Sequence, residues 1–158
     1  MIKVIAVGKI KEESLKELIN EYIKRIGRYD KITIEEVNEE KIPQTNSPAQ
    51  NEKAIELEGQ RLLNLIHDDE YVILLDLKGK MIDSVQLADS IEKIRTNKTG
   101  KIDFVIGGSL GVSPGLIKRA DWCWKLSDLT FPHQLARLLV LEQVYRSFKI
   151  QHHEPYHK

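Results

Sequence analysis

Three short segments carry residue types that could bind a small ligand. Residues 75–80 read Leu-Asp-Leu-Lys-Gly-Lys, so a carboxylate follows directly on an apolar run. Residues 106–111 read Ile-Gly-Gly-Ser-Leu-Gly, and such closely spaced glycines let backbone amides approach a ligand. Residues 126–133 place Leu129 and Phe131 in a predicted loop. Apolar side chains in a loop must fold into the protein or line a pocket, so the three segments are candidates for one binding site.

Each segment also has a simpler interpretation. Asp76 could do no more than cap its local backbone. The glycine segment differs from both familiar phosphate-binding loops: it reads G-G-x-x-G without the acidic residue of a dinucleotide site, and no Gly-Lys-Ser/Thr follows. It could be only a tight turn. His133 lies near the predicted start of a helix, where the helix dipole disfavours its charged form, so a structural role is expected for it.

The chain end could contact RNA. Residues 146–158 combine Arg, Lys and His with Tyr and Phe, side chains that pair with phosphate and stack on bases. A frayed terminus is the alternative. His152 and His153 are adjacent, and neighbouring histidines on a chain end rarely converge on one ion, so we expect no metal. Cys123 lies between two tryptophans and is predicted to be a buried structural thiol.

Alternating helices and strands must position these segments. Apolar runs or alternating patterns predict strands at 2–7, 31–37, 71–75, 102–106 and 122–126. Helical spacing predicts helices from a capping box at 14–17 to Gly27, over 47–66 and 84–94, from Ser113 and over 133–148. Residues 38–47 contain Pro43 and are predicted to form a loop. The pattern predicts one α/β domain over residues 1–158, with a mostly parallel sheet flanked by helices. Ligands bind outside the carboxyl ends of such strands, where the three segments lie.

Composition narrows the class of protein. The chain has 158 residues, 41% hydrophobic and 30% charged, which suits one folded domain. No apolar run approaches the roughly 18–20 residues that cross a membrane, and the start lacks a signal-peptide pattern. One cysteine excludes a disulfide framework, so we expect a cytoplasmic protein. The net charge of zero argues against binding nucleic acid through bulk charge. The predicted last helix is apolar around most of its surface and needs cover from the core or a second subunit.

Several separated motifs closely resemble the RlmH family, bacterial ribosomal RNA large-subunit methyltransferases of the SPOUT class. They occur in the family's order and end with the family's C-terminus. The motifs are Val105–Gly111, Leu126–Leu135, Leu141–Arg146 and Glu154–Lys158. The glycine loop departs from the pattern, with Gly-Ser-Leu-Gly where other members carry Gly-Pro-Glu-Gly.

The resemblance implies a fold and a reaction. The fold would be SPOUT-type with a deep C-terminal trefoil knot, and two copies would form a homodimer packed through the knot. Bent S-adenosylmethionine would be the methyl donor. The acceptor would be N3 of a pseudouridine in 23S rRNA within assembled 70S ribosomes. Neither DNA, a membrane nor a metal is expected to take part.

The resemblance also assigns residues, position by position. The cofactor would contact Leu75, Asp76, Gly107, Gly108, Ser127, Asp128, Leu129, Thr130, Phe131 and Pro132. The catalytic group would be Arg146, Tyr156 and His157, with Lys158 beside them and Glu142 in support. We hypothesise that His157 accepts or relays the N3 proton and that Arg146 offsets the developing negative charge. The chain end could serve the cofactor site of its own subunit or of the partner.

Two other classes stay open. A non-enzymatic ribosome-binding module would bind the RNA but not S-adenosylmethionine. A different nucleotide-binding α/β enzyme would bind its ligand and ignore ribosomes. The glycine and apolar loops disfavour the first class, and the basic and aromatic chain end disfavours the second.

Overall fold

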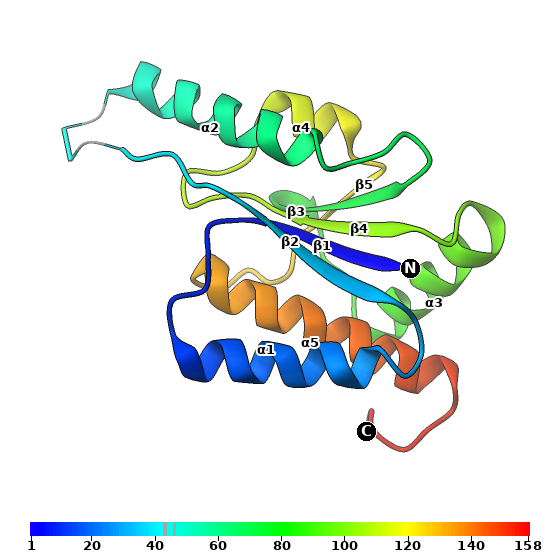
Figure 1. The fold of residues 1–158 in the computed structure, drawn as a ribbon. Helices are drawn as coiled ribbons and strands as arrows, with labels where there is room; N and C mark the ends of the chain where they lie inside the picture. Colours follow the sequence, from blue (N-terminus) through cyan, green and yellow to red (C-terminus); the bar gives the residue numbers. More distant parts are fainter. Residues whose placement is uncertain (43, 46) are drawn as a thin grey trace.

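The computed structural model describes residues 1–42, 44–45 and 47–158. Helices and strands alternate along the chain (Figure 1). The elements are β1 (Ile2–Val7), α1 (Glu13–Ile26), β2 (Ile32–Val37), α2 (Pro48–Leu63), β3 (Tyr71–Lys80), α3 (Ser84–Asn97), β4 (Ile102–Ile106), α4 (Pro114–Arg119), β5 (Trp122–Trp124) and α5 (His133–Gln151). The predicted α/β class is confirmed.

Strands β1 to β5 form one parallel sheet in the order β2-β1-β4-β3-β5. Helices α1, α3 and α5 cover one face and helices α2 and α4 cover the other (Figure 1). Every residue of β1 and β4 is buried, as expected for the central strands of a parallel sheet covered on both faces. The core on the α5 side includes Val4, Ile73 and Phe104, whereas Ile5 and Val105 point to the opposite core.

Several predicted boundaries are wrong. Helix α1 begins at Glu13, and its N-cap Glu12 makes no side-chain cap, so Ser14 lies inside the helix and the predicted capping box does not form. Helix α2 ends at Leu63, and β5 ends at Trp124. Strand β3 continues past Leu75 to Lys80 because both residues pair with Trp124, which makes residues 76–79 bulge out of the ladder.

Other predicted features agree with the structure. Helix α2 begins with a capping box between Ser47 and Gln50 and has proline in its first turn. In the loop predicted for 38–47, Pro43 and Asn46 lie outside the described residues. Within the described part of the chain, no helix has the length and hydropathy to cross a membrane. The C-terminal trefoil knot stays a prediction.

Candidate active site

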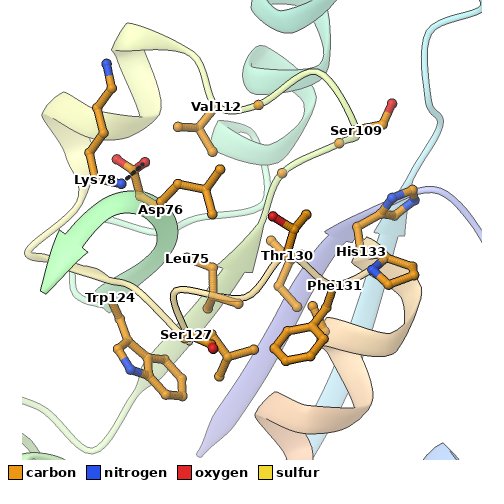
Figure 2. Close-up of a pocket in the computed structure, with 18 of the residues that line it drawn as sticks. Leu75, Asp76, Lys78, Ser109, Val112, Trp124, Ser127, Thr130, Phe131 and His133 are labelled. Carbon is orange, nitrogen blue, oxygen red and sulfur yellow. Dashed lines mark hydrogen bonds between the residues drawn. The ribbon is translucent and has the colours of Figure 1, made fainter. Parts of the chain in front are cut away.

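A cavity of about 600 Å³ opens at the carboxyl ends of β3, β4 and β5 (Figure 2). These strands are neighbours in the sheet, so the segments that follow them meet although they are far apart in sequence. Most of the lining residues come from the three segments. The cavity is lined by Leu75 to Lys78, Ile106 to Val112, Ile117, Trp124, Leu126, Ser127, Leu129 to His133 and Ala136. Nine of the ten residues assigned to the cofactor by resemblance line this cavity.

The glycine segment forms a tight loop in which backbone approaches the cavity. Gly108 and Gly111 form an isolated antiparallel bridge, and Gly111 has φ +114°, a conformation that favours glycine. A Cβ on Gly107 would lie 2.8 Å from Cγ1 of Val112, and a Cβ on Gly108 would lie 2.7 Å from Oε1 of Glu58. The loop therefore needs glycine for its own packing, and this packing fixes the amides and carbonyls that line the cavity.

Asp76 caps its local backbone as predicted, and its contact with the cofactor stays a prediction. Its Oδ1 accepts a hydrogen bond of 3.1 Å from the backbone N–H of Lys78, which stabilises the bulge of β3 (Figure 2). The same residue lines the cavity. Leu77 lies in the bulge with 71% of its side chain exposed and contributes an apolar rim to the cavity.

The third segment turns sharply before α5. The Ser127 hydroxyl accepts a hydrogen bond of 3.0 Å from the N–H of Leu129, whose side chain stays 70% exposed at the cavity. Thr130 and Phe131 lie across the cavity from Asp76 (Figure 2). Asp128 is the tenth residue assigned to the cofactor, and it does not line the cavity: its carboxylate pairs with Lys125 and is largely exposed.

The four residues predicted for catalysis meet in a second place, which we call the tail cluster: Glu142, Arg146, Tyr156 and His157. Nε and Nη2 of Arg146 lie 3.2 and 2.7 Å from Oε1 of Glu142. The Tyr156 hydroxyl donates to the same oxygen at 3.0 Å, and the Arg146 guanidinium lies 4.6 Å from the Tyr156 ring centre. Nη1 of Arg146 lies 3.2 Å from Nδ1 of His157. Lys158 follows as an exposed residue.

The tail cluster holds a fixed charge pattern. The bond to Glu142 raises the pKa of Arg146, which stays a cation. Burial, followed by hydrogen bonding to Tyr22 and Glu142, raises the pKa of Tyr156, which therefore stays protonated at neutral pH. A guanidinium can only donate, so Nδ1 of His157 is the acceptor of their hydrogen bond. A neutral His157 ring then carries its proton on Nε2.

A second cavity, of about 510 Å³, lies between the first cavity and the tail cluster. Trp124, Leu126, Ser127 and Phe131 line both cavities, and His157 lines only the second. His157 is thus the member of the tail cluster that lines the cavity next to the first one.

Sequence reasoning missed two polar residues of this region. The Ser84 hydroxyl donates to Oε1 of Gln143 at 2.7 Å, and Nε2 of Gln143 donates to Oε2 of Glu142 at 2.9 Å. This chain of bonds orients Glu142 from the first turn of α3. Gln143 directly follows Glu142 in the motif at 141–146, but only the packing of α3 against α5 identifies Ser84.

Cys123 is half-buried, whereas a buried thiol is predicted from the sequence. Burial and the nearby Asp76 raise the pKa of its thiol, which therefore stays protonated. Among residues 1–42, 44–45 and 47–158, no three His, Cys, Asp or Glu side chains form a group that could hold a metal ion.

Comparison with known proteins adds independent information. A family model described as predicted SPOUT methyltransferase matches residues 1–157. Three similar proteins are each named ribosomal RNA large subunit methyltransferase H. They come from Alkaliphilus oremlandii (48% identical), Carboxydothermus hydrogenoformans (47%) and Clostridium kluyveri (46%). Each match covers 157 residues, which is 99% of this chain and 99% of the relative.

Proposed function

We propose a reaction for this chain, which belongs to the SPOUT methyltransferase family and, within it, to the RlmH family, and is therefore an rRNA methyltransferase. We propose that it transfers a methyl group from S-adenosylmethionine to N3 of a pseudouridine in 23S rRNA. We further propose that it acts in the cytoplasm, as a homodimer, on the assembled 70S ribosome. The observation that supports this best is the cavity at the strand ends, which shares four lining residues with a second cavity that His157 of the tail cluster lines.

The cavity suits the methyl donor in size and chemistry. Its volume of about 600 Å³ falls within the usual range of about 300–1,000 Å³ for small-molecule sites. Leu77, Leu129 and Phe131 supply apolar surface for the adenine ring, and the backbone at Gly107 and Gly108 supplies hydrogen-bonding groups for polar edges. When bound, S-adenosylmethionine supplies an electrophilic methyl group on a positively charged sulfur.

The protein must then position the acceptor and manage one proton. Methyl transfer is an in-line displacement, so N3 must be held about 3–3.5 Å from the methyl carbon. N3 loses its proton as the new bond forms, and negative charge develops on the adjacent carbonyl oxygens. We assign acceptance or relay of the proton to His157 and stabilisation of the charge to Arg146, while Tyr156 and Glu142 hold the guanidinium in place.

The hydrogen bond between His157 and Arg146 links these two roles. The only ring nitrogen of His157 free to take a proton in the neutral tautomer is Nδ1, which already accepts from Arg146. Binding of the pseudouridine must therefore break the hydrogen bond between His157 and Arg146. The freed guanidinium can then contact the carbonyl oxygen next to N3. With the pair intact, His157 instead offers Nε2–H as a donor.

The homodimer is supported by apolar surface on α5 and its neighbourhood. Leu135 on α5 is 38% exposed, Leu139 is half-buried, and Val85 and Met81 near α3 are 44% and 46% exposed. The predicted need to cover α5 on nearly all sides is met by the subunit's own core for Val140, Leu141, Val144 and Phe148. A second copy would cover the remainder.

The test is methyl transfer from labelled S-adenosylmethionine to three substrates prepared from a strain that lacks the modification. They are 70S ribosomes, stripped 23S rRNA, and 70S ribosomes that carry uridine in place of pseudouridine. We expect label on N3 of a pseudouridine in the first sample and little in the other two.

The outcomes separate the alternatives. Binding of ribosomes without S-adenosylmethionine binding would identify a ribosome-binding module. Binding of S-adenosylmethionine without label on any RNA would indicate a different nucleotide-binding enzyme. Equal labelling of stripped RNA would overturn the 70S requirement and leave the rRNA methyltransferase assignment.

A further inference from the structure

The chain reverses direction at the end of α5 through two backbone hydrogen bonds. The N–H of His153 donates to the carbonyl of Ile150, and the N–H of Glu154 donates to the carbonyl of Lys149, both at 3.0 Å. This pair of bonds defines a Schellman motif, in which the residue after the cap takes a left-handed conformation. His153 has φ 54° and takes that place, which is usually held by glycine. The last residues are thereby directed back along α5.

Glu154 then ties the reversed segment to the body of the subunit. The Tyr29 hydroxyl lies 3.0 Å from both carboxylate oxygens of Glu154, and Nζ of Lys149 donates to Oε2. Tyr29 lies in the turn between α1 and β2. Its ring stacks on the fully buried Phe148, with ring centres 5.6 Å apart and planes inclined by 2°. Glu154 is thus bonded to two side chains, one of which packs on the core.

This attachment sets the position of the tail cluster. Only Pro155, with its restricted φ, separates Glu154 from Tyr156. Tyr156 packs edge-on against Tyr145, with ring centres 5.0 Å apart, and donates to Glu142. The next residue, His157, reaches Arg146. With so short a connection, a shift of Glu154 displaces both side chains from α5.

We propose that Glu154 is a positioning residue for the reaction: held by Tyr29 and Lys149, it fixes the chain end on its own subunit and so places Tyr156 and His157. Its catalytic consequence rests on the proposed function, whereas its effect on the chain end does not. No member of this clasp, which we define as Glu154, Tyr29 and Lys149, lines either of the two cavities described above.

Electrostatics favours the clasp at neutral pH. The bonds from Lys149 and Tyr29 lower the pKa of Glu154, and the bonds to Glu154 and Tyr29 raise the pKa of Lys149. Glu154 is therefore ionised and Lys149 charged across the range in which ribosomes are assayed.

The test uses Glu154→Ala and Tyr29→Phe, with Glu92→Ala as the matched control on the exposed surface of α3. Hydrogen exchange of the peptide over residues 149–158 reports whether the chain end is held, independently of activity. We expect exchange to accelerate at least about tenfold in Glu154→Ala and less in Tyr29→Phe, which keeps the ring stack. We expect kcat to fall in the same order while KM for S-adenosylmethionine stays unchanged.

The outcomes distinguish this inference from the proposed function. If exchange and kcat of both variants match those of the control, the clasp does not position the chain end and the inference is overturned. Faster exchange with full kcat would overturn the catalytic role assigned to the chain end. A fall in kcat accompanied by an equal rise in KM would mean general damage and would also overturn the inference. Failure of the proposed function is seen separately, as absence of transfer by the unaltered protein.

Discussion

The cavity at the strand ends and the tail cluster are built on opposite plans. The cavity takes its lining from three loops, each anchored by a strand of the central sheet, and consists mainly of backbone and apolar side chains. The tail cluster consists of charged and aromatic side chains from α5 and the last residues of the chain. Packing fixes the first region, whereas a few side-chain hydrogen bonds fix the second.

This difference predicts different consequences of mutation. A change in the cavity should alter the affinity for the methyl donor, because it alters the shape of a packed wall. A change in the tail cluster should alter turnover and leave that affinity intact, because none of its members lines the first cavity. A variant in one region that lowers both the affinity for the donor and the turnover would contradict this difference between the cavity and the tail cluster.

The largest effect is expected for Arg146→Ala in the tail cluster. The substitution removes the guanidinium assigned to the developing negative charge and leaves Glu142 without its strongest partner. Losing one such donor typically lowers turnover about 10²–10³-fold. Steady-state methylation of ribosomes should show this loss in kcat, and calorimetric titration should show unchanged binding of S-adenosylmethionine. Weaker binding by tenfold or more would place Arg146 in the donor site instead.

The next effect is expected for Gly108→Ala in the cavity. Its new Cβ would lie 2.7 Å from Oε1 of Glu58, a buried carboxylate that also accepts a bond from the N–H of Glu40. Since that carboxylate is held in place, the loop must shift, and we expect the affinity for S-adenosylmethionine to fall about tenfold, equivalent to about 1.4 kcal/mol.

Gly100→Ala is the matched control for Gly108→Ala. A Cβ at Gly100 meets nothing within 4 Å, so this variant should bind the donor like the unaltered protein. If calorimetry gives the two variants the same affinity, the glycine loop does not shape the donor site.

The two regions also differ in how far sequence predicts them. The apolar run at 71–75 and the segment 102–106, which is apolar except for Asp103, predict buried parallel strands, and the convergence of their carboxyl ends follows from the fold class. The membership of the tail cluster came from family resemblance, because periodicity cannot show where a chain end folds back. Its reversal depends on His153 in a left-handed conformation, which propensity does not favour.

The errors in the predicted boundaries of α1 and β3 also arise because local sequence patterns do not show contacts between distant residues. Local spacing predicts a capping box at Ser14, but α1 begins at Glu13 without a side-chain cap. Likewise β3 runs past Leu75 because β5 pairs again with Lys80, a long-range contact with no local signal. Ser84 and Gln143 support Glu142, and sequence does not reveal either role. Ser84 bonds to Gln143, 59 positions along the chain, and Gln143 bonds to its neighbour Glu142, so only the structure shows that the three side chains are connected.

A third prediction uses the amino ends of the strands, opposite the cavity, to separate stability from function. Nζ of Lys3 lies 2.8 Å from Glu70 and 3.5 Å from Asp103, and both carboxyls are buried. Burial, with the nearby Glu70 carboxylate, raises the pKa of Asp103 to about 8. The pKa of Glu70 is lowered and that of Lys3 is raised, so neither group titrates between pH 5 and about 8.

Asp103 is therefore protonated in the folded protein and ionised in the unfolded chain over that range. The folded state binds the extra proton, so the free energy of unfolding should decrease as pH rises toward 8, by at most about 1.4 kcal/mol per pH unit. In Asp103→Asn the side chain does not titrate, so the part of the slope that Asp103 causes should vanish. Urea unfolding at pH 6, 7 and 8 measures this slope. Asp89→Asn, on the exposed side of α3, should keep the slope. Methyl transfer at pH 7 should be unaffected by either change.

The smallest effect is expected for Asp128→Ala, which tests where the donor site ends along the third segment. Asp128 stands between two cavity residues, Ser127 and Leu129, yet its carboxylate points to Lys125 on an exposed surface. Such exposed pairs contribute little, so we expect the affinity for S-adenosylmethionine to change less than about twofold. Leu129→Ala removes apolar surface that a bound ligand would cover, and should weaken binding by up to about tenfold. Calorimetry compares the two variants. Equal losses of affinity would show that the loop moves on binding and brings Asp128 into the site. The cavity would then not be fixed by packing alone, and its contrast with the tail cluster would need revision.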